Sequence, residues 1–367
     1  MLASQLDKKK FKKICIIDAN EKVGSKIKVS GGGKCNITNG YVSFNNYLGD
    51  NKLVKEVLNS FSKDDLLRFL NKNTVFPKLN PKIVKGTYFC NSSSDAIQMF
   101  LKLVTHVKKY LNTRVLDVDF NDNFTIKTNK QNIQAKKVVV ASGGLSYPKL
   151  NATSIAYDIA QKFGHSITKL NPALVGFTVQ KEQFWFKNLS GVSTYVNIFV
   201  EGKKVEGSLL FAHKGCSGPA ILTTSLYWNK GKVAIDFLPN ENIENYFKSN
   251  KNITTALPFA KRFTQEFLAS IDLKDKQISK LTNEDKNKLR LLKYYEFSPA
   301  GNFGYSKAEV TKGGIQTKEL SNFESIKQNE LYFIGECLNV TGELGGFNFQ
   351  FAFSSAVKCA KNLNNKI

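Results

Sequence analysis

The segment Gly335–Gln350 constrains this chain more than any other part of the sequence. It follows a short apolar run, Leu331–Ile334, and precedes Phe351–Ala360, whose apolar and small residues are typical of a helix. Glu336 thus stands at the end of a predicted strand, and Gly345-Gly346 stands at a predicted helix start. Glycines at a helix start let backbone N–H groups approach a ligand that carries negative charge. This order of strand, carboxylate, glycine pair and helix predicts a binding site rather than a packed core.

A flavin cofactor needs both features of this segment. The carboxylate of Glu336 can accept a hydrogen bond from a hydroxyl of the ribityl chain. The positive end of a helix dipole can stabilise the negative charge that reduction places on the flavin ring. The sequence therefore predicts an FAD site, and the contacts expected from this segment are Gly335, Glu336, Gly345, Gly346, Asn348 and Gln350.

A second glycine-rich segment, Gly24–Asn39, follows Ile14–Ile17, which is predicted to be a buried strand. Three consecutive glycines alone would be typical of a flexible turn, but the polar residues around them favour a flavin or substrate contact. A third approach of the backbone to the dinucleotide is predicted after the apolar strand Val138–Val140. The contacts expected from these two segments are Ser30, Gly31, Gly32, Gly33, Asn36, Ala141, Ser142, Gly143 and Gly144.

Several residues near these glycines have two interpretations. Lys26 and Lys34 either neutralise the cofactor pyrophosphate or a substrate anion, or are solvated lysines of a Lys-rich chain. Asp18 either holds the adenosine ribose hydroxyls or only starts a turn, and the glycine-rich segment behind it favours the ribose role. The catalytic candidates are Cys35, as a proton donor or else a packed thiol, and His213, as a proton-transfer group or else a structural residue.

Together these segments resemble the BaiN/YhiN-like flavoproteins, which belong to the two-dinucleotide-binding-domain class of FAD enzymes. Gly24–Asn39 fits the family signature G-x-K-x-x-x-S-G-G-G-x-C-N-x-T-N. The resemblance covers nearly all of the chain, because four further segments match in order: Ala141–Pro148, Leu210–Pro219, Ala308–Gly314 and Gly335–Gln350.

The resemblance implies an α/β fold in which an FAD-binding Rossmann-like domain of the glutathione-reductase type is interrupted by an insert. We place the first part of the FAD-binding domain at 1–170, the insert at 171–307 and the last part at 308–367. Within the insert, 171–238 is expected to be β-rich and barrel-like, and 239–307 to be helical. In the first part, Asp95–Tyr110 is predicted to be a helix, and Val115 is expected to contact the cofactor.

The resemblance also implies a reaction. We expect a flavin-dependent oxidoreductase in which NAD(P)H reduces FAD and a conjugated C=C bond of a small molecule is then reduced. The alternative substrate is a uridine of large-subunit ribosomal RNA, which would become dihydrouridine. In this fold class a G-x-G-x-x-G loop carries the pyrophosphate, and we expect that loop and its strand to lie before Met1. A truncated, non-catalytic homologue is the remaining alternative.

Composition bounds the partners. The chain has 53 Lys+Arg against 30 Asp+Glu, a formal net charge of +23. This charge either draws the protein to ribosomal RNA, with the Lys-rich insert helices as the contact face, or reflects a compositional bias toward lysine.

The six cysteines form no C-x-x-C pair, so we expect neither a metal site nor dithiol chemistry. No apolar run is long enough for a membrane span and the N-terminus lacks a signal-peptide core, so we expect a cytoplasmic protein. The sequence leaves the oligomeric state open.

Overall fold

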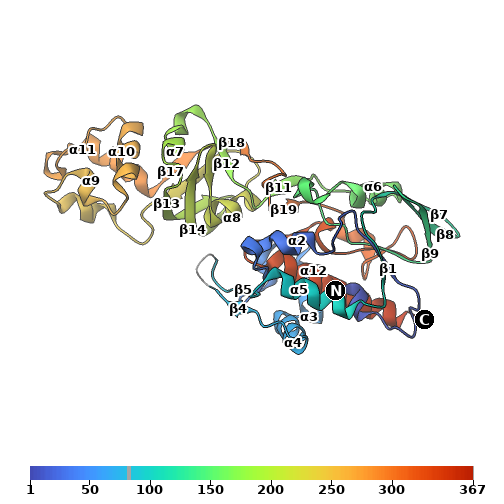
Figure 1. Ribbon diagram of the computed structural model, residues 1–367. Coiled ribbons are helices and arrows are strands. Elements are labelled where there is room, and N and C mark those ends of the chain that lie inside the picture. The colour runs from blue at the N-terminus through green and yellow to red at the C-terminus, as the bar shows by residue number, and fades with distance from the viewer. Residues whose placement is uncertain (81–83, 367) are drawn as a thin grey trace. The chain divides into compact units, whose positions relative to one another are not determined.

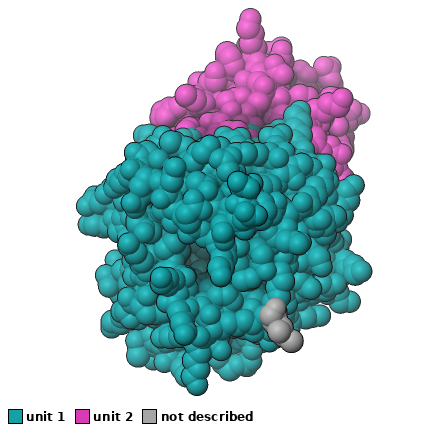
Figure 2. Space-filling model, turned by 90° about the vertical axis from the view of Figure 1, so that its right-hand side faces the viewer, with its two compact units in different colours: residues 1–172, 310–367 teal, residues 173–309 magenta. Residues whose placement is uncertain are grey.

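A computed structural model describes residues 1–80 and 84–366 of the chain (Figure 1). The chain divides into two units, which are coloured separately in Figure 2. Unit 1 is Met1–Pro172 with Val310–Ile367, and unit 2 is Ala173–Glu309. Unit 2 corresponds to the insert expected at 171–307, with each boundary two residues further along the chain.

Two pairs of parallel strands form the Rossmann-like part of unit 1. β1 (Cys15–Ile17) pairs with β6 (Lys108–Tyr110), and β10 (Val138–Val140) pairs with β22 (Leu331–Phe333). The carboxyl ends of neighbouring parallel strands lie at the same edge of a sheet. The loops that follow β10 and β22 are therefore brought together although they are far apart in sequence.

Two predictions for unit 1 were wrong in part. The predicted helix Asp95–Tyr110 is shorter, because α5 spans Ser93–Leu103 and Lys108–Tyr110 is the strand β6. Pairing with β1 overrides the helical spacing of the sequence at that point. The strand expected to be buried, β1, is only half buried and exposes Cys15, since β6 is the one strand that pairs with it among residues 1–80 and 84–366.

Smaller sheets and helices surround these strands. The further strands of unit 1 are β2 (Asn36–Asn39), β3 (Tyr47–Gly49), β4 (Lys78–Leu79), β5 (Thr87–Phe89), β7 (Val115–Asn121), β8 (Asn123–Thr128), β9 (Asn132–Ala135), β11 (Asn171–Ala173), β19 (Val310–Lys312), β20 (Leu320–Ser321), β21 (Glu324–Ser325) and β23 (Val340–Gly342). Its further helices are α1 (Leu2–Gln5), α2 (Ser25–Val29), α3 (Asn51–Ser60), α4 (Lys63–Lys72), α6 (Ile155–Lys162) and α12 (Phe347–Asn365). Local capping explains where some of them begin: Asp50 accepts a hydrogen bond from the N–H of Leu53 at the start of α3, and Ser62 forms a capping box at the start of α4.

The C-terminal helix α12 lies between two hydrophobic clusters of unit 1. Phe347 and Phe351 belong to a cluster with residues of α3 and β22. Phe353 and Val357 belong to a second cluster with residues of α4, α5 and β2. Because both clusters hold the helix, the position of its glycine-containing start is fixed by packing along its length.

Unit 2 is built on an antiparallel sheet of seven strands in the order β17-β16-β13-β14-β15-β12-β18. The strands are β12 (Phe177–Val179), β13 (Ser193–Val200), β14 (Lys203–Ala212), β15 (Gly215–Ser217), β16 (Val233–Asp236), β17 (Tyr295–Phe297) and β18 (Pro299–Asn302). Only Ser298 separates the two edge strands, and it can span about 7 Å between their ends. The edges of a flat sheet of this width would lie roughly 29 Å apart. The sheet must therefore curl until its edges meet, which is the barrel-like arrangement expected for the insert.

Unit 2 also contains helices, two of which contribute to an aromatic core. The helices are α7 (Trp185–Asn188), α8 (Pro219–Tyr227), α9 (Ile253–Ala256), α10 (Lys261–Ser270) and α11 (Asn283–Arg290). Trp185 contacts Phe263 and Phe267 of α10, and its indole N–H donates to the Tyr295 hydroxyl at 3.0 Å. The segment 239–307 was predicted to be helical, but it also contains β17 and β18, which close the sheet. No helix within the described part of the chain is both long and apolar enough to cross a membrane.

Candidate functional site

A carboxylate and a lysine meet at the carboxyl end of β22. Glu336 lies in the turn after that strand, and its Oε2 forms an ion pair with Nζ of Lys26. Its Oε1 accepts a hydrogen bond from the backbone N–H of Thr311 at 3.1 Å. The Glu336 side chain is 16% exposed and that of Lys26 is 36% exposed, so the pair is partly open to solvent. The fold thus joins the two glycine-rich segments that the sequence singled out.

The loop after β10 completes this cluster. A Cβ atom at Gly143, where φ is +77°, would lie 3.7 Å from Oε2 of Glu336. A Cβ atom at Gly144 would lie 2.5 Å from Oγ1 of Thr311. That oxygen accepts hydrogen bonds from the N–H groups of Leu145 at 2.8 Å and Ser146 at 3.2 Å. We call Lys26, Gly143, Gly144, Thr311 and Glu336 the Glu336 cluster.

Thr311 is a site residue that sequence reasoning missed. It lies in β19 and links the loop after β10 to the carboxylate after β22. The sequence held one signal for it, since Ala308–Gly314 was among the segments that match the family. No pattern within that segment indicates that its threonine would bridge two distant loops.

A buried polar atom without a partner among the described residues lies next to the start of α12. Gly346, with φ of +95°, is the N-cap residue of α12 and provides no side-chain cap. A Cβ atom there would lie 2.6 Å from Oδ1 of Asn36. That oxygen is buried and has no hydrogen-bond partner among the described residues. An acceptor beside an uncapped helix start fits a ligand edge that both donates and accepts hydrogen bonds, as the pyrimidine edge of a flavin does.

The three-glycine turn has a backbone that needs glycine. Gly31, Gly32 and Gly33 have φ of 57°, 64° and 86°. A Cβ atom at Gly32 or Gly33 would meet nothing within 4 Å, so the left-handed backbone rather than crowding excludes other residues there. The Ser30 hydroxyl donates to the Ile27 carbonyl at 2.8 Å, and Lys34 is exposed beside the turn.

Several predicted contacts are engaged within the protein itself. Gln350 is fully buried, accepts from the Thr38 hydroxyl at 2.6 Å and donates to Ser354 at 2.9 Å. The Asn348 side chain accepts from the N–H of Gly342 at 2.8 Å and donates to its carbonyl at 2.9 Å. These contacts brace the segment before and within the first turn of α12, and direct cofactor contacts of the two residues stay predictions.

Asp18 occupies the carboxyl end of β1. Its Oδ1 accepts from the backbone N–H of Asn20 at 2.9 Å and from the Asn20 side-chain amide at 3.0 Å. Its carbonyl accepts from the N–H of Thr113, which brings the start of β7 and Val115 toward the same strand end. One carboxylate oxygen of Asp18 thus caps a turn, as the turn interpretation expects. The ribose role of Asp18 and the cofactor contact of Val115 stay predictions.

The two catalytic candidates lie in different settings. Cys35 is fully buried, and its contact with the Cys90 thiol, together with burial, raises the pKa of the Cys35 thiol. This setting favours the packed-thiol interpretation of Cys35. His213 is exposed at the turn between β14 and β15, in unit 2. A catalytic role for either residue stays a prediction.

The remaining predicted contacts follow the strands. Ala141 and Ser142, directly after β10, are exposed, whereas Gly335, directly after β22, is buried and donates its N–H to the Ser355 hydroxyl at 3.2 Å. Gly345 is buried, and its carbonyl accepts from the Asn39 side chain at 3.0 Å. The contacts predicted after β10 and β22 therefore lie at one edge of the parallel strands.

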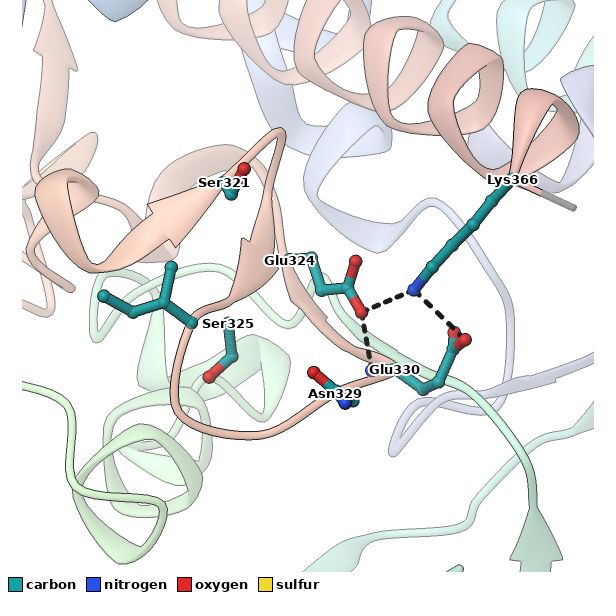
Figure 3. A pocket seen from close by; sticks show the side chains of 7 residues that line it. Ser321, Glu324, Ser325, Asn329, Glu330 and Lys366 are labelled. Atoms are coloured by element: carbon teal, nitrogen blue, oxygen red, sulfur yellow. Dashed lines mark hydrogen bonds and ion pairs between the residues drawn. The ribbon is translucent and has the colours of Figure 1, made fainter.

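A polar pocket of about 550 Å³ lies at the other end of β22 (Figure 3). Nζ of Lys366 bridges Glu324 at 2.7 Å and Glu330 at 3.1 Å there, and the figure shows the lysine reaching in from the end of α12. Ligands of parallel α/β sheets bind at the carboxyl ends of the strands, and this pocket precedes the strand. We therefore assign the candidate cofactor site to the Glu336 cluster and not to the pocket.

Comparison with known proteins decides the family. A family model described as "HI0933-like protein Rossmann domain" matches residues 1–362. The chain belongs to this family. It is 35% identical to a Haemophilus influenzae protein named "Ribosomal RNA dihydrouridine synthase", over 97% of this chain and 93% of the relative. It is 36% identical to an Escherichia coli protein of the same name, over 99% and 95%. It is 27% identical to the Clostridium scindens "3-dehydro-bile acid delta(4,6)-reductase", over 93% and 90%.

Membership confirms the family resemblance and the fold class predicted from the sequence, an α/β fold with a Rossmann-type FAD-binding domain. At the same coarse level it supports a flavoprotein of the oxidoreductase class.

Proposed function

We propose that this protein binds FAD at the Glu336 cluster and uses NAD(P)H to reduce a conjugated C=C bond. The observation that carries the proposal is the meeting of three glycine-containing segments around one carboxylate. Glu336 forms an ion pair with Lys26 of the first segment and lies close to Gly143 of the second. The third segment supplies Glu336 itself and the start of α12.

The residues have distinct roles in this proposal. Glu336 accepts a hydrogen bond from a ribityl hydroxyl, and Thr311 holds the carboxylate in place through its N–H. Lys26 pairs with the carboxylate, and a cofactor phosphate would have to compete with Glu336 for its charge. Asn36 accepts from the ring edge, and the N–H groups at the start of α12 stabilise negative charge on the ring. When bound, FAD supplies hydride transfer from a nicotinamide to a polarised carbon.

A uridine of large-subunit ribosomal RNA is the second candidate substrate. Two observations favour it over a small molecule such as a bile acid. The relatives named for ribosomal RNA are 35% and 36% identical, against 27% for the bile-acid reductase. The positive charge is also distributed unequally between the units. Unit 1 holds 34 Lys+Arg and 17 Asp+Glu, a net charge of +17, and unit 2 holds 19 Lys+Arg and 13 Asp+Glu, a net charge of +6. The two values add up to the +23 of the chain.

This distribution favours unit 1 over the insert helices as the RNA-contacting region. Two cations of the helical part of the insert are also paired: Lys276 with Asp285, and Arg290 with Glu244, both at 2.7 Å. A phosphate would have to compete with these carboxylates.

The test begins with the visible absorption spectrum of the purified protein. We expect a flavin spectrum that bleaches under anaerobic conditions when NADH or NADPH is added. The nucleotide that bleaches the flavin faster is the electron donor. Ribosomal RNA from a deletion strain should lack dihydrouridine that returns with the intact gene. A flavin that bleaches without any change in the RNA would leave a small-molecule reductase. Protein that neither carries nor takes up FAD would instead support a non-catalytic binding module.

A further inference from the structure

An exposed tyrosine next to the start of α12 has a lysine over its ring. Tyr41 is 61% exposed, and Nζ of Lys85 lies 5.2 Å from the centre of its ring. A Cβ atom at Gly86 would lie 2.5 Å from the Tyr41 ring, so the ring rests on bare backbone at that point. Only glycine at position 86 permits this placement, and its φ of +79° is also one that favours glycine.

A buried amide holds this pair in place. Asn39 is fully buried, and its Oδ1 accepts from the N–H of Tyr41 at 2.9 Å. Its Nδ2 donates to the carbonyls of Lys85 and Gly345, each at 3.0 Å. The two carbonyl oxygens therefore lie within 6.0 Å of each other, the sum of the two bonds. One side chain thus ties the exposed pair to the segment that starts α12, where we place the flavin ring.

The neighbouring surface is also apolar. Leu79 is 55% exposed and pairs with Tyr88 across β4 and β5. A Cβ atom at Gly40, the residue before Tyr41, would lie 3.6 Å from the Tyr88 ring. Exposed aromatic and apolar groups beside a cation, on a unit with charge +17, match a partner with flat rings and negative charge.

We propose that Tyr41 and Lys85 form a platform for an unpaired nucleotide of RNA, with the base stacked on Tyr41 and a phosphate at Lys85. This inference rests on the proposed action on a ribosomal RNA uridine and names the residues that would receive that substrate. Stacking on a tyrosine tolerates any base, so the platform accounts for capture of a single strand rather than for choice of sequence.

The experiment separates stacking from charge. Binding of a uridine oligomer is compared with binding of an abasic oligomer of equal length and charge, at two salt concentrations. Tyr41→Ala should weaken uridine binding roughly 5- to 100-fold and leave abasic binding unchanged. Lys85→Gln should weaken both and make the log–log salt slope shallower by about 0.7. Tyr41→Trp should retain uridine binding.

Matched controls come from unit 2, where Nζ of Lys187 lies 3.3 Å from the ring centre of Phe184, which is 45% exposed. Phe184→Ala and Lys187→Gln should bind both oligomers like the wild type, and all variants should keep the same flavin spectrum. Equal uridine binding by Tyr41→Ala and the wild type, or equal loss of both oligomers in Tyr41→Ala, would overturn the platform. Dihydrouridine in ribosomal RNA is measured separately. If it is independent of this protein while Tyr41→Ala still loses base-dependent binding, the platform stands and only the proposed substrate fails.

Discussion

The two ends of β22 use the same residue types for different purposes. Before the strand, Lys366 joins Glu324 and Glu330, and Glu330 also pairs with Lys137. After the strand, Lys26 pairs with Glu336, and the loop after β10 approaches the carboxylate at Gly143. Both ends hold lysines and glutamates in close contact, yet we assign a ligand to only one of them.

The difference lies in what surrounds each carboxylate. At the first end, protein cations surround Glu330. Burial alone would raise the pKa of its carboxyl, but the bonds from Lys137 and Lys366 outweigh burial and lower that pKa. At the second end, Gly143 is half-buried beside the carboxylate, and Asn36 keeps a buried acceptor without a partner in the described ranges near the start of α12. A charged network that satisfies its own groups supports stability, whereas a buried acceptor without a partner beside an uncapped helix start is a better candidate for a ligand contact.

The largest expected effect is on flavin affinity. Glu336→Ala removes the proposed acceptor of a ribityl hydroxyl, and a hydrogen bond to a charged group contributes on the order of 1.5–3 kcal/mol. We expect flavin affinity to fall roughly 10- to 100-fold, measured by titrating FAD into flavin-free protein. Glu330→Ala is the matched control at the other end of β22 and should leave affinity unchanged. Equal losses in both variants would remove the distinction between the two ends.

A crowding test follows for the Glu336 cluster. In Gly144→Ala the new Cβ atom would lie 2.5 Å from Oγ1 and 2.7 Å from Cβ of Thr311, with little room to move. We expect the free energy of unfolding to fall by about 1–3 kcal/mol, as for other overpacked sites, measured by urea denaturation. Gly40→Ala is the control, because its Cβ atom would make only ordinary contacts from 3.6 Å. Wild-type stability in Gly144→Ala would show that the loop after β10 is not fixed by Thr311.

A pH test addresses the other end of the strand. The buried His165 ring places Nε2 2.6 Å from the Ser325 hydroxyl, and Glu319 and Lys327 lie nearby. Burial, aided by Lys327, lowers the pKa of His165 against the opposing effect of Glu319. The folded state therefore favours the neutral His165 ring. The contribution of this preference to stability is complete above the pKa of histidine in the unfolded chain, about 6.5, and is lost as the pH falls below that value.

We expect wild-type stability to decline as the pH falls below about 6.5, by at most about 1.4 kcal/mol per pH unit from this group. His165→Asn should flatten that decline, and His106→Gln, a change at an exposed histidine, should not. Urea denaturation from pH 7 to 5 measures both. A decline that is the same in all three proteins would place the responsible group elsewhere.

The smallest effect is expected from the ion network itself. Lys366 is 39% exposed, and its partners Glu324 and Glu330 are 20% and 29% exposed, so solvent and salt screen their attraction. Lys366→Met should cost less than about 1 kcal/mol, and the cost should shrink in high salt. Flavin affinity should stay at the wild-type value. A change in that affinity would mean that the two ends of β22 are coupled through the strand.

Much of the candidate site was visible in the sequence because its chemistry is local. The glycines of Gly31–Gly33 and Gly345-Gly346 mark backbone that needs left-handed φ values or close approach, and such needs are met within a few residues. The family and the α/β class followed from the order of these segments. The carboxylate at Glu336 was predicted for the same reason, since it directly follows its strand.

The partners across the chain could not be predicted in this way. The pairing of Lys26 with Glu336, the bridge from Thr311 and the contact of Cys35 with Cys90 join residues that no spacing relates. The residues of β6 continue the helical pattern of α5 in sequence, so the sequence predicts a helix there. Pairing with β1, which no local pattern indicates, makes them a strand. Sequence alone determined which backbone conformations and chemical groups were available, since these depend on neighbouring residues. Tertiary structure decided which groups meet, because that depends on how parallel strands align and how the sheet of unit 2 closes.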